Sequence, residues 1–523
     1  MSLENHFLPF RNNIIGQSLN HEINGKQLDI VYADWTASGR LYAPIEHYIT
    51  DTLGPFVANT HTETNLTGCA MTHAYHDAQK IIKRHVNACD NDVLITAEAG
   101  MTGVINKFQR ILGLRIPERM QAQVKFDDCD KPVVFITHME HHSNQTTWYE
   151  CDITLEIVDP DSHGLPSLEH LQLLLEKYQA RKVKIGSFSA CSNVTGIKTP
   201  YHLLAEKMHE HGGLCFVDFA CSAPYVDIDM HPTNSKQSLD AIYFSPHKFL
   251  GGPGSSGVLI FNKALYKNRV PDHPGGGTVT WTNPWGEHSF FNNIEMREDG
   301  GTPGFLQCIR TALAIKVKNA MGVDKITARE KEITDYVMTE LAKNDKVVML
   351  EKNVKDRLAI VSFYLPNVHY NLVVRLLNDK FGVQTRGGCS CAGTYGHILL
   401  NVDHDTSNKI TEKINSGDYA EKPGWIRASF HPTTSDKEVR YIVEAINQVT
   451  ENIVEWAKEY RFNPASGDFE HKNSAVEYPS LSDFNALVLP DTAVAETKHQ
   501  ADIKQNNSTE IKTSSSLLKK IFG

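Results

Sequence analysis

The segment AIYFSPHKFLGGPGSSGVLI, residues 241–260, constrains the fold most, because it places one lysine between two apolar runs. AIYF predicts a short buried strand, and the run that begins at Val258 predicts another. Four glycines between positions 251 and 257 let the intervening backbone turn tightly. We therefore expect Lys248 to be firmly placed and partly dehydrated, and dehydration favours the neutral amine, which can form a Schiff base with a carbonyl compound. A surface lysine in a glycine hairpin is the simpler alternative for this segment alone.

Two nucleotide-binding motifs share letters with this segment. Gly252, Gly254 and Gly257 match the G-x-G-x-x-G spacing, but that motif must open a helix, and here an apolar strand follows. A phosphate-binding P-loop needs its lysine after the glycines, whereas Lys248 precedes them. Both interpretations are rejected.

Length and composition are those of a soluble globular protein. The 523 residues allow two domains and a tail, and 41% hydrophobic with 22% charged residues is ordinary. A net charge of -10 gives no general electrostatic reason to bind nucleic acid or an anionic membrane. The start of the chain lacks a signal-peptide pattern, and no apolar run approaches the ~20 residues of a membrane span. We expect a cytoplasmic protein without membrane contact, whose ten cysteines are reduced thiols.

Short apolar runs alternate with helical patterns over residues 61–310. The runs are DVLITA, VVFITH, ITLEIVD, VKIGSFSA, LCFVDFA and AIYFSP. Strands that alternate with helices predict a mostly parallel α/β sheet covered on both faces.

Three further regions complete the predicted organisation. Residues 1–60 form an N-terminal segment that joins the small domain, and its strand LDIVYADWTASG has a tip that could reach a site built elsewhere. A helical region over 305–344 leads into a smaller α+β domain, residues 311–462. Asn, Ser, Thr and Lys dominate in 463–523, which predicts a mostly disordered tail. Its end, SSLLKKIFG, is read as a solvated terminus, with an amphipathic anchor or docking peptide as the alternative.

Polar residues follow the ends of the predicted strands, where open α/β sheets bind ligands. After DVLITA, Gly100 and Thr102 offer backbone N–H groups and a hydroxyl to an anion such as phosphate. Other strand ends are followed by His141, Asn193, Asp218, Ser245, His247 and Lys248. Each residue alone has a structural explanation, such as a helix cap. Together they provide what pyridoxal phosphate requires: a lysine, a carboxylate for the ring nitrogen, a stacking group and a phosphate cradle.

Ordered motifs make the chain resemble the class V aminotransferase family of fold-type I pyridoxal-phosphate enzymes. The resemblance covers about residues 30–455 and is closest to the cysteine desulfurase and selenocysteine lyase branch. It rests on four motifs: Met-Glu-His-His at 139–142, Ser-Asn-Val-Thr-Gly at 192–196, Ser-Pro-His-Lys-Phe at 245–249 and Arg-Gly-Gly-Cys-Ser-Cys-Ala at 386–392. It implies a large, mostly parallel, seven-stranded α/β/α domain and a smaller α+β domain.

The resemblance also implies roles for individual residues. Lys248 would carry the cofactor and move protons at the substrate α-carbon, and Asp218 would keep the pyridine nitrogen protonated. His141 would lie over the ring, and Asn193 would reach the ring hydroxyl. The phosphate would be bound by residues that share a helix start or a strand end: Gly100, Met101, Thr102, Ser245 and His247.

The resemblance assigns Thr278 to a neighbouring subunit's site. The run Gly275–Thr278 looks like the segment by which one subunit completes its partner's phosphate site. A homodimer with shared active sites is therefore expected.

Arg427 and Cys391 would act on the substrate. Arg427, in WIRASF, matches the arginine that pairs with the substrate carboxylate, a task suited to a planar guanidinium; an ordinary surface arginine is the alternative. Cys391 occupies the place of the persulfide-forming cysteine, which must attack the sulfur of bound cysteine from a mobile loop.

Two cysteines depart from the family pattern. Cys389 precedes Cys391 by two positions, so the pair could be a persulfide relay, a redox-sensitive pair or part of a structural loop. Cys221 stands where the family commonly has a glutamine near the ring hydroxyl. Metal binding by Cys389 and Cys391 with His397 and His404 is rejected, because C-x-x-C spacing is absent.

The expected function is that of a desulfurase-like lyase. It would remove sulfur or selenium from a cysteine-type amino acid through an enzyme persulfide, leave alanine, and pass the sulfur on, with a protein as a possible acceptor. The alternatives are an aminotransferase, an epimerase or a carbon–sulfur lyase that acts on another amino acid, and a non-catalytic sulfur carrier or scaffold.

Overall fold

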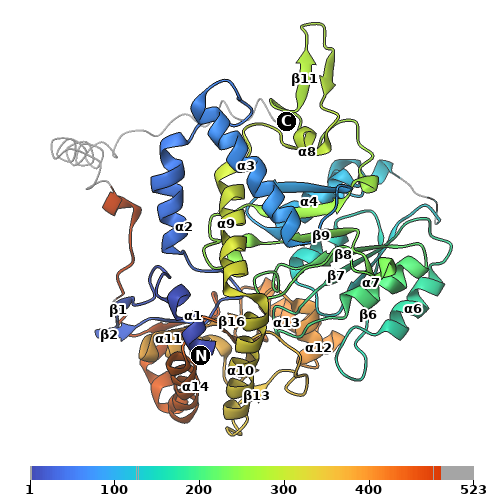
Figure 1. The fold of residues 1–523 in the computed structure, drawn as a ribbon. Coiled ribbons are helices and arrows are strands. Elements are labelled where there is room, and N and C mark those ends of the chain that lie inside the picture. The colour runs from blue at the N-terminus through green and yellow to red at the C-terminus, as the bar shows by residue number, and fades with distance from the viewer. Residues whose placement is uncertain (1–2, 125–126, 128, 475, 485–523) are drawn as a thin grey trace, which may run out of the picture. The chain divides into compact units, whose positions relative to one another are not determined.

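A computed structural model describes residues 3–124, 127, 129–474 and 476–484 (Figure 1). The main compact unit comprises residues up to 21 and residues 27–472. A second, small unit comprises residues 22–26 and the described residues between 473 and 484, in which Leu481–Phe484 form a short 3₁₀ turn. The predicted terminal peptide SSLLKKIFG lies outside the described residues.

A seven-stranded sheet forms the centre of the main unit, with the strand order β4-β10-β9-β8-β7-β5-β6. Strands β5 to β9 are parallel to their neighbours in this set, whereas β10 runs antiparallel to both β4 and β9. The predicted mostly parallel sheet is confirmed. The strands are β4 (Asp92–Ala97), β5 (Val133–Thr137), β6 (Thr154–Val158), β7 (Lys184–Ser189), β8 (Leu214–Asp218), β9 (Ala241–Phe244) and β10 (Gly257–Asn262).

Helices cover both faces of this sheet. Alternate residues of β9 point to opposite faces: Ile242 and Phe244 belong to one apolar cluster, and Ala241 and Tyr243 to another. The first cluster includes residues of α3 (Leu66–His85), α6 (Leu168–Lys177), α7 (Tyr201–Glu210) and α9 (Phe305–Met321). The second cluster includes residues of α4 (Met101–Ile111).

A four-stranded antiparallel sheet, β13-β14-β17-β16, lies farther along the chain. Its strands are β13 (Val348–Met349), β14 (Ile360–Tyr364), β16 (Arg386–Gly388) and β17 (Trp425–Ser429). A third apolar cluster joins it to α10 (Val323–Leu341), α11 (Tyr370–Phe381) and α14 (Asp436–Trp456). The N-terminal segment reaches this region, because β3 (Val31–Tyr32) pairs in parallel with β15 (Val383–Gln384).

The helical region predicted over 305–344 is two helices. Gly322 ends α9 and precedes α10 with a φ of 78°, a left-handed conformation that glycine adopts without strain. The chain therefore changes direction at this glycine, between the helix packed on the large sheet and the helix packed on the small one.

The first residues of the predicted disordered tail are ordered, so this prediction was wrong for them. Strands β18 (Tyr460–Asn463) and β19 (Asp468–His471) form a hairpin. The rings of Phe462 and Phe469 contact each other in a tilted arrangement with 4.8 Å between their centroids, and Phe469 packs on the third cluster. The composition of this stretch predicts disorder, because it averages over many polar residues. The contact between its two aromatic residues is what orders the hairpin.

The remaining elements are short or peripheral. No helix of the described residues is long and apolar enough to cross a membrane. The elements are α1 (Leu3–Arg11), β1 (Asn20–Ile23), β2 (Lys26–Asp29), α2 (Ala43–His47), α5 (Thr146–Tyr149), β11 (Val279–Thr282), β12 (His288–Phe290), α8 (Ile294–Glu298), α12 (Gly393–Leu399) and α13 (His404–Asn415).

Candidate active site

A cavity of about 210 Å³ lies beyond the carboxyl ends of several strands of the large sheet. Residues from both sheets and from the N-terminal segment line it. The predicted site residues among them are Met101, Thr102, His141, Asn193, Asp218, Ser245, His247, Lys248, Cys391 and Arg427. Topology thus brings together side chains that are scattered over more than 300 positions of the sequence.

Lys248 lies on a 3₁₀ turn, Pro246–Lys248, directly after β9. Burial lowers the pKa of its amine from the usual 10.5, while Cys221 and Asp218 act in the opposite direction. Burial raises the pKa of Asp218, at the end of β8, to about 7, and its Oδ1 accepts a hydrogen bond of 2.7 Å from the backbone of Ala220. A dehydrated amine and a buried carboxyl group therefore face the same cavity.

Close backbone contacts hold the lysine turn in place. A Cβ atom at Gly252 would lie 1.8 Å from the carbonyl oxygen of Pro246, so only glycine fits there. A Cβ atom at Gly39 would lie 1.9 Å from the carbonyl oxygen of Phe249, and the N–H of Gly39 donates to the carbonyl of His247 over 2.9 Å. The N-terminal segment therefore packs directly against the turn that carries Lys248.

The start of α4 forms a candidate anion site, as predicted for the glycine turn after β4. The backbone N–H of Met101 donates to Ser245 Oγ over 2.8 Å, and Thr102 Oγ1 lies 2.6 Å from Ser143 Oγ. The predicted residue Gly100 does not line the cavity. It packs closely on Ser245, because a Cβ atom at position 100 would lie 3.0 Å from Ser245 Oγ. Burial lowers the pKa of His247 to about 4, so its imidazole is neutral at pH 7. The first N–H groups of a helix have no partner within the helix, which suits a phosphate.

The two histidines after β5 have different tasks in the fold. Burial, and then the charge of Lys248, lowers the pKa of His141 to about 3, so its ring is neutral. His141 Nδ1 accepts a 3.1 Å hydrogen bond from the N–H of Ser143. His142 binds the cysteine loop instead: its N–H donates to the carbonyl of Cys391 over 2.7 Å, and its Nε2 accepts from the N–H of Gly393 over 2.9 Å.

The cysteine loop is tied down at several points, although the sequence interpretation required a mobile loop. Cys391 and Ser390 both have positive φ, 57° and 51°, an uncommon conformation for such residues. The carbonyl of Ser390 accepts a 2.7 Å hydrogen bond from Asn193 Nδ2. Cys391 lines the cavity, whereas Cys389 does not. Of the two cysteines, the structure therefore gives Cys391 access to the site.

Arg427 is held from two sides. Its Nη2 donates to Asp34 Oδ1 over 2.7 Å, and its Nη1 donates to the carbonyl of Asn193 over 3.0 Å. Its Nε is buried without a hydrogen-bond partner. The open Nε–H leaves room for an acceptor such as a carboxylate, which guanidinium groups bind with parallel hydrogen bonds. The surface-arginine alternative is excluded, because the Arg427 side chain is 3% exposed.

Sequence reasoning missed several residues of the site. Thr36 and Ala37 line the cavity, which confirms that the tip of the N-terminal segment reaches a site built elsewhere, but Asp34 was not singled out. The strand-end rule could not find Asp34, because it belongs to no strand of the large sheet. Ser143, Ser189 and Cys191 also line the cavity, as do Arg386 and Ser390 of the cysteine-loop motif, and the sequence reasoning gave none of these five a role.

Thr278 and the candidate metal ligands lie elsewhere. Thr278 is buried, donates through Oγ1 to the carbonyl of Gly275 over 2.6 Å, and does not line the cavity. His397 bonds through both ring nitrogens, to the carbonyl of Gly393 and to Ser407 Oγ. Within the described residues, a group close enough to share a metal ion is Cys89, Asp92 and His231, and none of these lines the cavity.

The cavity residues fit pyridoxal phosphate. A buried lysine amine, a buried carboxyl group, a neutral imidazole and the N-terminus of a helix are the groups that this cofactor uses. Asn193 Oδ1 is buried at the cavity wall without a hydrogen-bond partner, so it could accept a hydrogen bond from a bound cofactor. The residues present therefore suit the cofactor's aldehyde, ring and phosphate.

Comparisons with known proteins point to one family. The family model described as aminotransferase class-V matches residues 31–442. A probable cysteine desulfurase of Staphylococcus aureus (strain COL) is 26% identical over 437 residues, which cover 83% of this chain and 94% of the relative. A probable cysteine desulfurase of Halalkalibacterium halodurans is 28% identical over 378 residues, which cover 72% of this chain and 86% of the relative.

Solved structures share the fold. An apo cysteine desulfurase of Thermococcus onnurineus NA1 superposes with a TM-score of 0.68 at 22% identity, covering 85% of this chain and 98% of that one. A cysteine desulfurase of Escherichia coli in an S-sulfonic acid form gives a TM-score of 0.65 at 20% identity, with the same coverage. At this level of identity the likeness establishes the fold.

Proposed function

Because the chain belongs to the aminotransferase class-V family, we propose that it is a pyridoxal-phosphate-dependent lyase of the cysteine desulfurase type. It would remove sulfur from cysteine, or selenium from its analogue, and leave alanine. One observation carries the proposal: Cys391 lines the same cavity as Lys248, Asp218 and Arg427. A thiol at that position distinguishes a desulfurase from an enzyme that only moves the amino group or the α-proton.

Seven residues would hold the cofactor. Lys248 would bind its aldehyde carbon, Asp218 its ring nitrogen and Asn193 its hydroxyl, with His141 against the ring face. Met101, Thr102 and Ser245 would bind the phosphate at the start of α4, beside the neutral ring of His247. When bound, pyridoxal phosphate supplies an electron sink for the carbanion that forms at the substrate α-carbon.

Lys248 is suited to proton transfer. Burial lowers the pKa of its amine, so a larger fraction of it is neutral at pH 7 than of an exposed lysine amine. A neutral amine can take the α-proton of a bound amino acid and return it later to the carbon skeleton. Asp218 lies in the same cavity, and as a carboxylate it would stabilise positive charge on the ring nitrogen.

Arg427 and Cys391 would orient and cleave the substrate. The guanidinium group, held by Asp34 and the carbonyl of Asn193, would bind the substrate carboxylate. The Cys391 thiolate would attack the substrate sulfur, so that a sulfur–sulfur bond forms as the carbon–sulfur bond breaks. The product at Cys391 would be a persulfide. A reductant would then release its outer sulfur as sulfide, or a sulfur-acceptor protein would take that sulfur over.

A cysteine pair in one loop provides the test. The cofactor-loaded chain, given L-cysteine and a reductant, should release sulfide and alanine in equal amounts. Cys391→Ser should abolish sulfide release and keep the bound cofactor. Cys389→Ser is the matched control and should stay active, because Cys389 does not line the cavity. Full sulfide release by Cys391→Ser would refute the assignment of the sulfur acceptor.

The second candidate is an aminotransferase, epimerase or carbon–sulfur lyase that needs no thiol nucleophile. Hydrogen bonds from His142 and Asn193 that tie the cysteine loop favour it, because a tethered thiol is less free to reach the substrate. Formation of a keto acid from a panel of amino acids, without sulfide, would identify this alternative.

The assembly and cellular setting are part of the same proposal. A homodimer with shared sites rests on the resemblance of the run Gly275–Thr278 to the segment that completes a partner's phosphate site, and Thr278 does not line the cavity of its own chain. A cytoplasmic location is part of the proposal and is compatible with the ordinary composition.

A further inference from the structure

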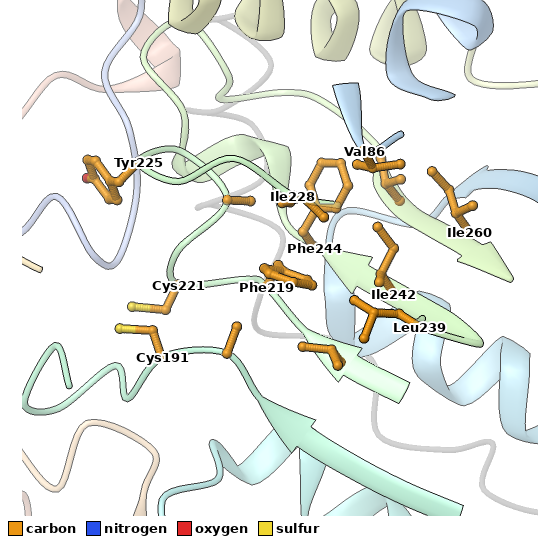
Figure 2. Close-up of a cluster of buried hydrophobic side chains, with 14 of the residues drawn as sticks. Val86, Cys191, Phe219, Cys221, Tyr225, Ile228, Leu239, Ile242, Phe244 and Ile260 are labelled. Atoms are coloured by element: carbon orange, nitrogen blue, oxygen red, sulfur yellow. The ribbon is translucent and has the colours of Figure 1, made fainter. Parts of the chain in front are cut away.

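Two thiols that the proposed reaction does not use lie side by side in the cavity wall. Cys191 and Cys221 follow β7 and β8, which are parallel neighbours with Ser189 opposite Asp218. Their sulfur atoms lie next to each other in Figure 2, and both side chains line the cavity. Adjacent strand ends therefore create a vicinal pair from residues 30 positions apart in the sequence.

The hydrogen bonds make the two thiols unequal. Cys191 Sγ lies 3.1 Å from the carbonyl oxygen of Gly196, and Cys221 Sγ lies 3.8 Å from that of Ser192. A hydrogen bond from Cys191 lowers the pKa of Cys221 below 9.0, whereas burial raises the pKa of Cys191 well above it. The Cys221 thiol is therefore the more acidic of the two.

The surrounding charges support the same asymmetry. Lys248 and Arg427 stabilise negative charge on Cys221, and Asp218 opposes it. On the other side of the pair, Glu330 disfavours a thiolate at Cys191, and Lys198 favours it weakly. A more acidic thiol near two cationic side chains, beside a less acidic thiol, is the arrangement of redox-active cysteine pairs. Both side chains are largely buried, and each contributes only a small exposed area to the cavity wall.

We propose that Cys191 and Cys221 form a second reactive site, a dithiol that small disulfides oxidise to an internal disulfide when they enter the cavity in its cofactor-free state. The inference concerns thiols outside the proposed desulfurase reaction and does not depend on it. Low-molecular-weight disulfides are the ligand class, because the cavity of about 210 Å³ admits only a small molecule.

The reaction takes place in two exchanges. The Cys221 thiolate attacks one sulfur of the small disulfide, a mixed disulfide forms, and a small thiolate leaves and takes up a proton. Cys191 then loses its proton and attacks the Cys221 sulfur, which expels the second small thiol. The two protein thiols are oxidised to one disulfide, and the small disulfide is reduced to two thiols.

The proposed order of attack predicts which cysteine carries the mixed disulfide, and this distinguishes it from non-specific oxidation of thiols. The cofactor-free chain is incubated with 2-hydroxyethyl disulfide and digested without reductant, because bound pyridoxal phosphate would occupy the cavity that the disulfide must enter. We expect a linked peptide pair that contains Cys191 and Cys221, with loss of two hydrogen atoms, reversed by dithiothreitol. Cys191→Ser should instead trap the mixed disulfide on Cys221. Cys221→Ser should leave Cys191 unmodified, because its proton is retained.

Cys215 is the control within the same chain. It is fully buried, burial raises its pKa well above 9.0, and it does not line the cavity, so it should stay unmodified throughout. Absence of the linked pair, or equal modification of Cys191 in the Cys221→Ser chain, would overturn the inference. Each readout is a peptide mass, so a failure of the desulfurase assay leaves this result unaffected.

Discussion

Arg427 and Asp34 form an ion pair with 2.7 Å between Nη2 and Oδ1, although 393 positions separate them. The pair joins the N-terminal segment to the small sheet at the wall of the cavity. An arginine held in this way presents one fixed geometry to a carboxylate, so we expect Asp34 to act as a positioning residue if Arg427 binds the substrate.

We expect Asp34→Asn to raise the KM for the amino-acid substrate by about 10–100-fold, because a hydrogen bond to a charged group contributes ~1.5–3 kcal/mol. The effect on kcat should be smaller, since Lys248 and the cofactor site stay intact. Arg427→Lys should show the same KM effect or a larger one. Arg440→Lys, at an exposed position of α14, is the control and should leave KM unchanged. An unchanged KM in Asp34→Asn would contradict the positioning role.

Replacement of the buried lysine tests the cofactor site. Lys248→Ala should lose the absorbance band of lysine-bound pyridoxal phosphate and lower kcat by roughly 10²–10⁴-fold, the usual contribution of general acid–base catalysis. Lys263→Ala, in the exposed turn after β10, should retain the band and the activity. A persistent band in Lys248→Ala would assign the cofactor to another lysine.

Asp218 makes the stability of the cofactor-free chain depend on pH. Its carboxyl group has a pKa of about 7 in the folded chain and 3.8 as the ordinary value, so the folded state binds the extra proton between these values. Stability therefore falls as pH rises from about 4 to about 7 and stays lower above that. Asp218→Asn should remove this contribution, which urea unfolding of both chains across the pH range will show. Parallel curves for the two chains would contradict it.

Shared active sites can be tested by complementation. Thr278→Asp should weaken cofactor binding through repulsion of the phosphate, and Lys248→Ala should be inactive. Co-expressed, the two chains form heterodimers that have one intact site if Thr278 serves the partner's site. Random pairing then restores about one quarter of the wild-type activity. No recovery would place Thr278 in the site of its own chain or outside both sites.

Much of the fold could be predicted from the sequence, because its signals are local. Short apolar runs predicted the strands of the large sheet, and the helical patterns between them predicted the helices that pack on its two faces. Local signals failed where the structure depends on single residues. Gly322 divides one predicted helical region in two, and the Phe462–Phe469 contact orders a hairpin in a stretch with a disordered composition.

The sequence by itself determined which chemical groups are available and roughly where the turns lie. Lys248 between two strands and the polar residues at strand ends follow from periodicity, because parallel strands deliver their carboxyl ends to one edge. The order of the motifs along the chain made the family resemblance recognisable.

Only the tertiary structure decided which of these groups meet. The Arg427–Asp34 pair, the tie between Asn193 and the cysteine loop, and the Cys191–Cys221 pair each join separate elements. The dehydration that tunes Lys248 and Asp218 comes from the same assembly. Burial and long-range contacts are properties of the packed chain, and no local pattern of residues encodes the distance between two side chains on different elements.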